Sequence, residues 1–347
     1  MEGPLSHFRF AQFQFILRAQ DCLNLPAYKG STFRGGFGYA FKKIVCVNRE
    51  KGCGSCLLKS KCVYSYAFET PPPSDTSKMR KYPYAPHPFI ITPPLEEKRI
   101  YREGERICFE LALIGKSIDY LPYFIYTFDE LGRMGIGKGK GKYHLEEVRV
   151  LQIGQRLKVK GGRTEDQGQR AEIKEKIIYS GKDKILRTDY QIIHSGDLFP
   201  FHPAPPAFNQ TCDLAPFTLD LIFLTPARLK YEGKLTPPLE FHVLIRNLLR
   251  RISLLSYFHC EKELDLDFKG LIEKSSEIKV AKSNLKWFDW ERYSNRQEIR
   301  MKMGGFIGSI TFEGDFKSYL PFLLLGEYIH VGKGTSFGLG KYKIRGI

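Results

Sequence analysis

The chain has 347 residues, which is enough to bury a full hydrophobic core and most naturally forms two domains. Its hydrophobic content of 42% is ordinary for a globular protein, and neither a membrane span of roughly 18 apolar residues nor a secretion signal is present, so we expect a cytoplasmic protein. The formal net charge of +16 predicts a polyanionic partner, with nucleic acid ahead of an anionic membrane surface.

The chain begins with a predicted strand and helix. Residues 8–18 alternate apolar and polar side chains, which is typical of a half-buried strand. A turn over 25–31 then leads into a helix over 32–45. One face of this helix is apolar, with Phe33, Phe37, Ala40, Phe41 and Ile44, and the other carries Tyr39, Lys42 and Lys43.

Four cysteines follow this helix in a short segment, Cys46, Cys53, Cys56 and Cys62. A Cys-x-x-Cys pair flanked by two more cysteines can close a tetrahedral zinc site or hold an iron-sulfur cluster. Four thiolates would saturate the metal, so we expect a structural site, with zinc ahead of an iron-sulfur cluster. The alternative is four unrelated free thiols.

The next part of the chain supplies the remaining elements of a first domain. Residues 70–98 are rich in proline and predict an extended connection. A strand is predicted over 105–114, a helix over 119–131, and a final strand over 143–153. Between the helix and the final strand lies a loop of alternating glycine and lysine residues, 135–142.

An internal repeat links this region to the end of the chain. Tyr120-Leu121-Pro122 matches Tyr319-Leu320-Pro321, and Gly141-Lys142-Tyr143 matches Gly340-Lys341-Tyr342. Both pairs are separated by 199 residues (319 − 120 and 342 − 143). Each half of the chain is therefore predicted to end in the same unit of helix, glycine-rich loop and strand.

The second half repeats the order of the first. A strand is predicted over 218–229 and a helix over 239–258, whose exposed face groups His242, Arg246, Arg250 and Ser253. A strand pair is predicted within 287–312, and Arg296 lies in it beside aromatic and polar neighbours suited to RNA. A cationic stripe on a helix is equally compatible with plain solvation.

These elements predict an α+β fold of two tandem ferredoxin-like (RRM-like, βαββαβ) domains, with a cysteine-rich insertion in the first. We expect the first domain over 1–154, with its insertion at 46–62. Residues 155–212 are charged and then rich in proline, and we expect a linker or peripheral strands there. The second domain is expected over 213–347.

The last loop has four glycines in nine positions, Gly332, Gly334, Gly338 and Gly340. Glycine lets backbone N–H groups approach an anion closely, and the loop adds Lys333, Lys341 and the ring of Phe337. It is not a nucleotide-binding P-loop, because a helix precedes the loop and a strand follows it. We expect it to contact a phosphate backbone.

The sequence resembles the RAMP superfamily of CRISPR-associated proteins, and within it the Cas6 endoribonucleases that process precursor CRISPR RNA. Residues 332–342 are similar to the family's C-terminal glycine-rich signature, and 293–297 with 304–308 are similar to the segment before it. Residues 25–35 with Phe37-Gly38 resemble the N-terminal helix motif of the superfamily. The cysteine segment also resembles one found in some members.

The resemblance implies RNA cleavage that needs no catalytic cofactor: the ribose 2′-OH attacks the adjacent phosphate and leaves a 2′,3′-cyclic phosphate and a 5′-OH. This chemistry requires a base, an acid and a cation near the phosphate. Many members place a histidine on or near the first helix, whereas this chain has none between His7 and His87. We therefore expect Tyr39 and Lys42 to stand in for it, together with His242 on the equivalent helix of the second half.

The expected partner is CRISPR repeat RNA within precursor crRNA, bound by a monomer or a homodimer. The residues expected to contact it are Lys29, Arg34, Arg246, Arg250, Arg296, Gly332, Lys333, Gly334, Ser336, Phe337, Gly338, Gly340 and Lys341. The main alternative is a RAMP subunit that binds guide RNA among other CRISPR effector subunits without cutting it. The missing first-helix histidine favours that alternative, and the C-terminal signature favours the processing enzyme. A zinc-dependent nuclease is a third possibility, which saturation of the metal by four cysteines disfavours.

Overall fold

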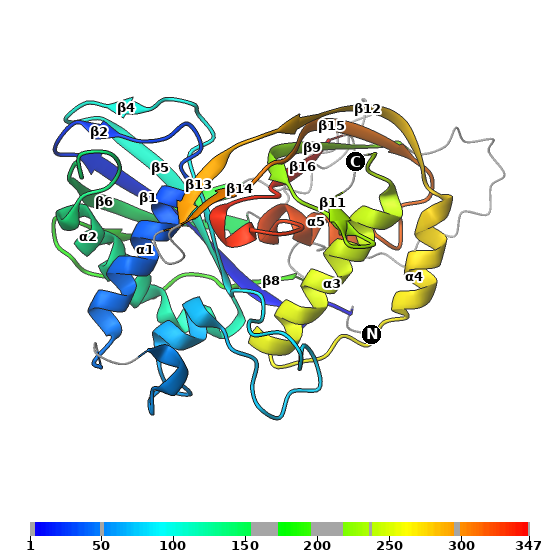
Figure 1. The fold of residues 1–347 in the computed structure, drawn as a ribbon, viewed down its shortest axis with the longest axis horizontal. Coiled ribbons are helices and arrows are strands. Elements are labelled where there is room, and N and C mark those ends of the chain that lie inside the picture. Colours follow the sequence, from blue (N-terminus) through cyan, green and yellow to red (C-terminus); the bar gives the residue numbers. More distant parts are fainter. Residues whose placement is uncertain are drawn as a thin grey trace, which may run out of the picture.

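The computed structural model describes residues 4–48, 52–153, 173–195, 218–235, 238–294 and 299–345. Within them the chain forms two main antiparallel sheets, one in each half, with helices packed on each sheet (Figure 1). Among the described helices, none combines the length and apolar character needed to cross a bilayer.

The first half builds a ferredoxin-like sheet. Its elements are β1 (Arg9–Ala19), α1 (Gly30–Val45), β3 (Phe89–Thr92), β5 (Arg106–Ile114), α2 (Leu121–Met134) and β6 (Tyr143–Ile153). The strands lie in the order β3-β5-β1-β6, and all neighbours are antiparallel, as expected for a βαββαβ unit. A small separate sheet pairs β2 (Leu23–Asn24) with β4 (Ile100–Tyr101).

Part of the segment expected to act as a linker belongs to this first sheet. Strand β7 (Ile173–Ser180) pairs with β6 and extends the sheet by one strand. Strand β8 (Ile193–His194) pairs with the beginning of β1. The first sheet therefore continues beyond residue 154. Strands β7 and β8, in the segment expected to form a linker or peripheral strands, are part of this sheet.

The predicted apolar faces of the helices form the core of the first half. Phe33, Phe37, Ala40 and Phe41 of α1 are all buried. The ring of Phe37 stacks on that of Phe124 from α2 with centroids 4.8 Å apart. Burying several phenyl rings between the helices and β1 and β5 fixes the position of α1 on the sheet.

The second half repeats the arrangement with additional hairpins. Its elements are β9 (Thr218–Ala227), β10 (Lys230–Tyr231), β11 (Lys234–Leu235), α3 (Phe241–His259), α4 (Phe268–Lys274), β12 (Lys279–Phe288), β13 (Glu291–Ser294), β14 (Ile299–Lys302), β15 (Gly305–Glu313), α5 (Leu320–Ile329) and β16 (Tyr342–Arg345). The main sheet has the order β12-β15-β9-β16, which is the same order as in the first half. The hairpin β13–β14 reaches toward α1 (Figure 1), and Trp290 before it packs on Tyr28 with centroids 4.6 Å apart.

The structure confirms the internal repeat and gives it a physical basis. Tyr143 and Tyr342 are buried at the start of β6 and β16, and their hydroxyls donate to the carbonyls of Phe128 and Leu323 at 2.9 and 2.6 Å. Helix α2 has 14 residues and α5 has 10. The helix starts and strand starts keep the same spacing in both halves, so about one turn of helix has become loop in the second half.

Candidate nucleic-acid interface

The glycine-rich loop between α5 and β16 has a backbone that only glycine adopts easily. Gly332, Gly334, Gly338 and Gly340 all have positive φ, between 73° and 87°. A Cβ atom on Gly340 would overlap the carbonyl oxygen of Val331, and one on Gly338 would lie 2.7 Å from the carbonyl oxygen of Ile91. Gly332, Gly338 and Gly340 are therefore required by the close approach of neighbouring backbone, which at Gly338 comes from β3 in the first half.

The same loop joins the two halves through hydrogen bonds and an ion pair. The Tyr28 hydroxyl donates to the Phe337 carbonyl at 2.7 Å. Lys341 Nζ lies 2.5 Å from Glu110 Oε2 on β5, and the lysine is buried. The expected contact of Lys341 with RNA does not fit this arrangement, because its charge is already neutralised by Glu110. Gly338 likewise faces β3 of the first half, whereas Gly340 packs against Val331 within the second half.

A column of alternating aromatic and cationic groups runs past the loop. The guanidinium of Arg34 lies 4.2 Å from the ring centroid of Phe68 and 4.5 Å from that of Phe337. Arg292, from β13, approaches the ring of Phe337 at 4.5 Å. Each guanidinium packs against the face of an aromatic ring, so its N–H groups point outward in the guanidinium plane and not into the ring. The column therefore presents arginine donors beside the loop.

Beside this column lies a groove of about 620 Å³ between the two halves. The glycine-rich loop, α3, the β10–β11 turn and the segment 79–87 form its walls. Its lining residues are Met79, Tyr82, Tyr84, Ala85, Pro86, His87, Lys230, Glu232, Gly233, Asn247, Arg250, Arg251, Leu254, Gly332, Lys333, Gly334, Thr335, Ser336 and Phe337. Cations outnumber acids in this set, so the groove attracts anions.

The floor of the groove contains a buried arginine, Arg251. Its side chain is 8% exposed, and its Nε donates to the Ile329 carbonyl at 2.9 Å. Within the described residues its Nη2 has no hydrogen-bond partner. Burial lowers its pKa to about 9, so the group still carries a positive charge at neutral pH. An uncompensated buried charge is costly, and an anion in the groove would offset that cost.

His87 forms part of the groove wall and contacts Arg34. Its Nε2 lies 3.0 Å from an Arg34 Nη2, and its Nδ1 lies 2.9 Å from Thr70 Oγ1. Arginine can only donate, so Nε2 holds the lone pair and Nδ1 carries the proton. Burial, with Arg34 as the next contribution, holds the pKa of His87 well below its usual value of 6.5. The imidazole is therefore neutral and able to accept a proton.

The structure brings together about half of the residues expected to bind RNA. Arg34 contacts Ser336 Oγ with its Nε at 3.2 Å. The expected residues that line the groove are Arg250, Gly332, Lys333, Gly334, Ser336 and Phe337. Burial, together with Lys230 and Arg228, lowers the pKa of Lys333.

The other expected RNA contacts lie elsewhere. Lys29 is completely buried, and its Nζ donates to the carbonyls of Ala27 at 3.2 Å and Glu96 at 2.6 Å, so it supports the fold and is not presented to a ligand. Arg246 is exposed on α3 and lies 5.6 Å from the ring of Tyr231, outside the groove lining. Arg296 lies outside the described residues.

The three residues expected to be catalytic are not brought together. Tyr39 is 68% exposed on α1, and Lys42 Nζ lies 5.8 Å from the ring of Tyr64. His242 Nε2 lies 2.8 Å from Glu240 Oε2 at the start of α3. Within the described part of the chain none of the three lines the groove. Helical periodicity placed Tyr39 on an outer face correctly, but the side chain of His242 is only 15% exposed.

His87 and Arg251 are among the groove residues that the sequence did not lead us to expect. His87 stands between two prolines in a stretch that predicts only a connection. The burial of Arg251 could have been predicted. Leu248, Ile252 and Leu255 mark the apolar face of the helix, and position 251 lies on that face. An arginine among buried helix positions is uncommon and indicates a specific role.

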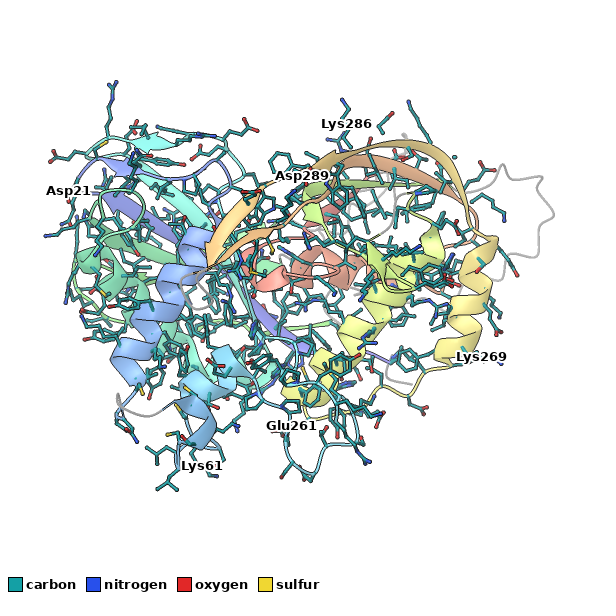
Figure 2. The ribbon with its side chains drawn as sticks, in the orientation of Figure 1. Asp21, Lys61, Glu261, Lys269, Lys286 and Asp289 are labelled. Carbon is teal, nitrogen blue, oxygen red and sulfur yellow. The ribbon has the colours of Figure 1, made fainter. Side chains whose placement is uncertain are left out.

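The expected metal site is not assembled in the described residues. No group of three or more histidine, cysteine or acidic side chains there is placed to hold a metal ion. Burial raises the pKa of the Cys53 thiol. Lys61, beside Cys62, lies at the outer edge of the molecule (Figure 2). Metal binding stays a prediction.

Models of known protein families match residues in both halves of the chain. Residues 221–342 match the model of the CRISPR-associated endoribonuclease Cas6, and residues 8–172 match a model named AF_1859_N, described as an N-terminal domain. An uncharacterized protein of Archaeoglobus fulgidus is 25% identical over an alignment of 335 positions, and the match covers 93% of this chain and 93% of that protein.

Solved Cas6 structures share the fold. A partial Cas6-RT-Cas1–Cas2 complex superposes with a TM-score of 0.54 at 14% identity, covering 99% of this chain and 47% of the other. The chain thus spans about half of that larger protein. A Thermus thermophilus Cas6 in a product complex gives a TM-score of 0.52 at 14% identity, covering 96% of this chain and 98% of the other. Residues 221–342 are thus similar to the Cas6 family of CRISPR-associated endoribonucleases, and the fold of the chain is that of solved Cas6 structures.

Proposed function

We propose that the chain cleaves precursor CRISPR RNA within its repeat, in the groove between the two halves. The ribose 2′-OH of one nucleotide attacks the adjacent phosphorus, and the bond from phosphorus to the 5′ oxygen of the next nucleotide breaks. The products are a 2′,3′-cyclic phosphate and a 5′-OH. The observation that carries the proposal is a neutral histidine, His87, in a groove lined by arginine and lysine.

In this proposal His87 is the general base. Its Nε2 lone pair is held in place by an N–H of Arg34. When RNA binds, the attacking 2′-OH takes the place of that N–H and gives its proton to Nε2. The displaced guanidinium of Arg34 stays beside Phe68 and Phe337, where it contacts the reacting phosphate.

Lys333 and Arg251 complete the chemistry. The lowered pKa of Lys333 makes its ammonium a better proton donor, so we assign it to protonate the leaving 5′ oxygen. Arg251 lies beneath the groove, and its charge stabilises the developing charge on the phosphate from a fixed position. Arg250 adds a second cation at the rim.

A second candidate is a subunit that binds guide RNA without cutting it. The observation that favours it is the hydrogen bond of Arg34 to His87, because a base whose lone pair is occupied is inactive until the contact breaks. In that case the groove would hold RNA, and other CRISPR effector subunits would be its partners.

The deciding experiment uses the purified chain and labelled RNA that carries the repeat of its own CRISPR array, in the presence of EDTA. A matched series of RNAs has one 2′-deoxy substitution at each position. One cut in EDTA that is abolished by a single deoxy position establishes the proposed reaction and locates the phosphate. Tight binding with every RNA intact, also after Mg²⁺ is restored, establishes the second candidate.

A further inference from the structure

We infer that the groove takes RNA in single-stranded form, and that Tyr82 and Tyr84 stack on an unpaired base next to the reacting phosphate. The inference rests on the proposed function and adds the form of the substrate to it.

Two large aromatic rings stand open to solvent at the groove. Tyr82 is 53% exposed and Tyr84 is 48% exposed, and both line it. They flank Pro83 in the proline-rich segment, which restricts the backbone between them. The guanidinium of Arg250 lies 5.9 Å from the ring of Tyr82. Exposed rings held beside cations form the stacking surface that single-stranded nucleic acid uses.

These rings belong to the same wall as the proposed base. Tyr82 and Tyr84 precede His87 by only a few residues, and Lys333 and the glycine-rich loop line the same groove. A nucleotide whose base stacks on the tyrosines therefore has its sugar and phosphate within the part of the groove that contains His87 and Lys333. Stacking would thus position the nucleotide that reacts.

The size of the groove argues for an unpaired nucleotide. Its volume of about 620 Å³ falls in the range of pockets that enclose a single small ligand, roughly 300–1,000 Å³. An A-form duplex is far larger and hides the faces of its bases inside the stack. A paired base could not reach the floor at Arg251 or lie on a tyrosine ring.

The test measures stacking and cleavage separately. The full chain is mixed with repeat RNAs that carry the fluorescent base 2-aminopurine at each position in turn, and stacking is detected as quenching on binding. The variants are Tyr82→Ala, Tyr84→Ala and the corresponding Phe substitutions. Tyr126→Ala is the matched control, because Tyr126 is also 53% exposed but lies on α2, outside the groove lining.

We expect quenching at one or two adjacent positions next to the mapped cut. Each Ala substitution should weaken RNA binding by about 10-fold and reduce the quenching, because stacking on an aromatic ring contributes roughly 1–3 kcal/mol per base. The Phe variants and Tyr126→Ala should bind RNA like the unchanged protein. A short complementary strand that pairs the quenched positions should block binding in the groove, whereas one that pairs distant positions should not.

The inference is overturned if the Ala variants bind and quench like the unchanged protein, or if pairing the positions beside the cut leaves cleavage unaffected. Quenching that depends on the tyrosines without any cut would support the inference and overturn the proposed reaction. Cleavage at the normal rate in both tyrosine-to-alanine variants would support the proposed reaction and overturn the inference.

Discussion

An N–H group of Arg34 lies 3.0 Å from Nε2 of His87, although the whole cysteine-rich segment separates the two residues along the chain. This contact fixes the tautomer of the histidine and places its lone pair at the groove. Helix α1 contains no histidine, but the contact places His87, from the connection before β3, beside Arg34 of that helix.

The first prediction concerns His87→Ala. We expect RNA cleavage to fall by about 10²- to 10⁴-fold, the usual effect of losing a general base, while RNA binding changes little. Single-turnover cleavage and equilibrium binding measure the two effects. Tyr39→Phe, Lys42→Ala and His242→Ala should cleave at nearly the normal rate, because these residues lie outside the groove lining. Full activity in His87→Ala would exclude it as the base.

The second prediction concerns the pH dependence of cleavage. A general base works only when it is unprotonated, and burial lowers the pKa of His87 well below 6.5. The neutral form therefore persists into mildly acidic solution, and cleavage should decline only at pH values clearly below 6.5. The measurement is cleavage rate against pH with RNA well below saturation, which reports on the free protein. A decline centred at or above pH 6.5 would contradict the assignment.

The third prediction compares two glycines with similar backbone angles. Gly340 has φ +73° and Gly139 has φ +86°, but only Gly340 has neighbouring backbone where a Cβ would lie. Gly139→Ala should cost about 1–2 kcal/mol of unfolding free energy, from the positive φ alone. Gly340→Ala should cost clearly more, because Val331 must also move. Urea unfolding of both variants measures the difference, and equal losses would show that the close contact is unimportant.

The fourth prediction concerns the cysteines. We propose that Cys46, Cys53, Cys56 and Cys62 bind a structural zinc ion, with an iron-sulfur cluster as the alternative. Elemental analysis and the visible spectrum of freshly purified protein distinguish the two. Cys53→Ser should lose the metal and lower the thermal unfolding midpoint, whereas Cys22→Ser, at an exposed cysteine outside the segment, should change neither. Protein that is free of metal and insensitive to Cys53→Ser would contradict the site.

The fold was predictable because its signals are local and repeated. Alternation in β1, the apolar face of α1 and the 199-residue repeat each depend on neighbouring residues, and together they give the βαββαβ order that the two sheets confirm. The strands β7 and β8 were less clear, because they follow a charged stretch with weak alternation.

The site was only partly predictable because its contacts are distant in sequence. Closely spaced glycines predict a close approach of backbone, but they do not say whether an anion or another strand approaches. Here strand β3 does so at Gly338, and Glu110 neutralises Lys341. The burial of Lys29 and the position of His87 beside Arg34 likewise depend on tertiary packing.

The shorter helix α5 has a consequence for how the two halves are joined. Both halves have the tyrosine whose hydroxyl ties the helix to the following strand, and the difference in length lies between these fixed points. The connection after α5 is longer by about one helical turn, and it contacts the first half through Phe337, Gly338 and Lys341. The two connections are therefore not interchangeable: residues 136–141 in place of 331–340 would be four residues too short to join α5 to β16 at the present spacing, and the graft would also remove one wall of the groove.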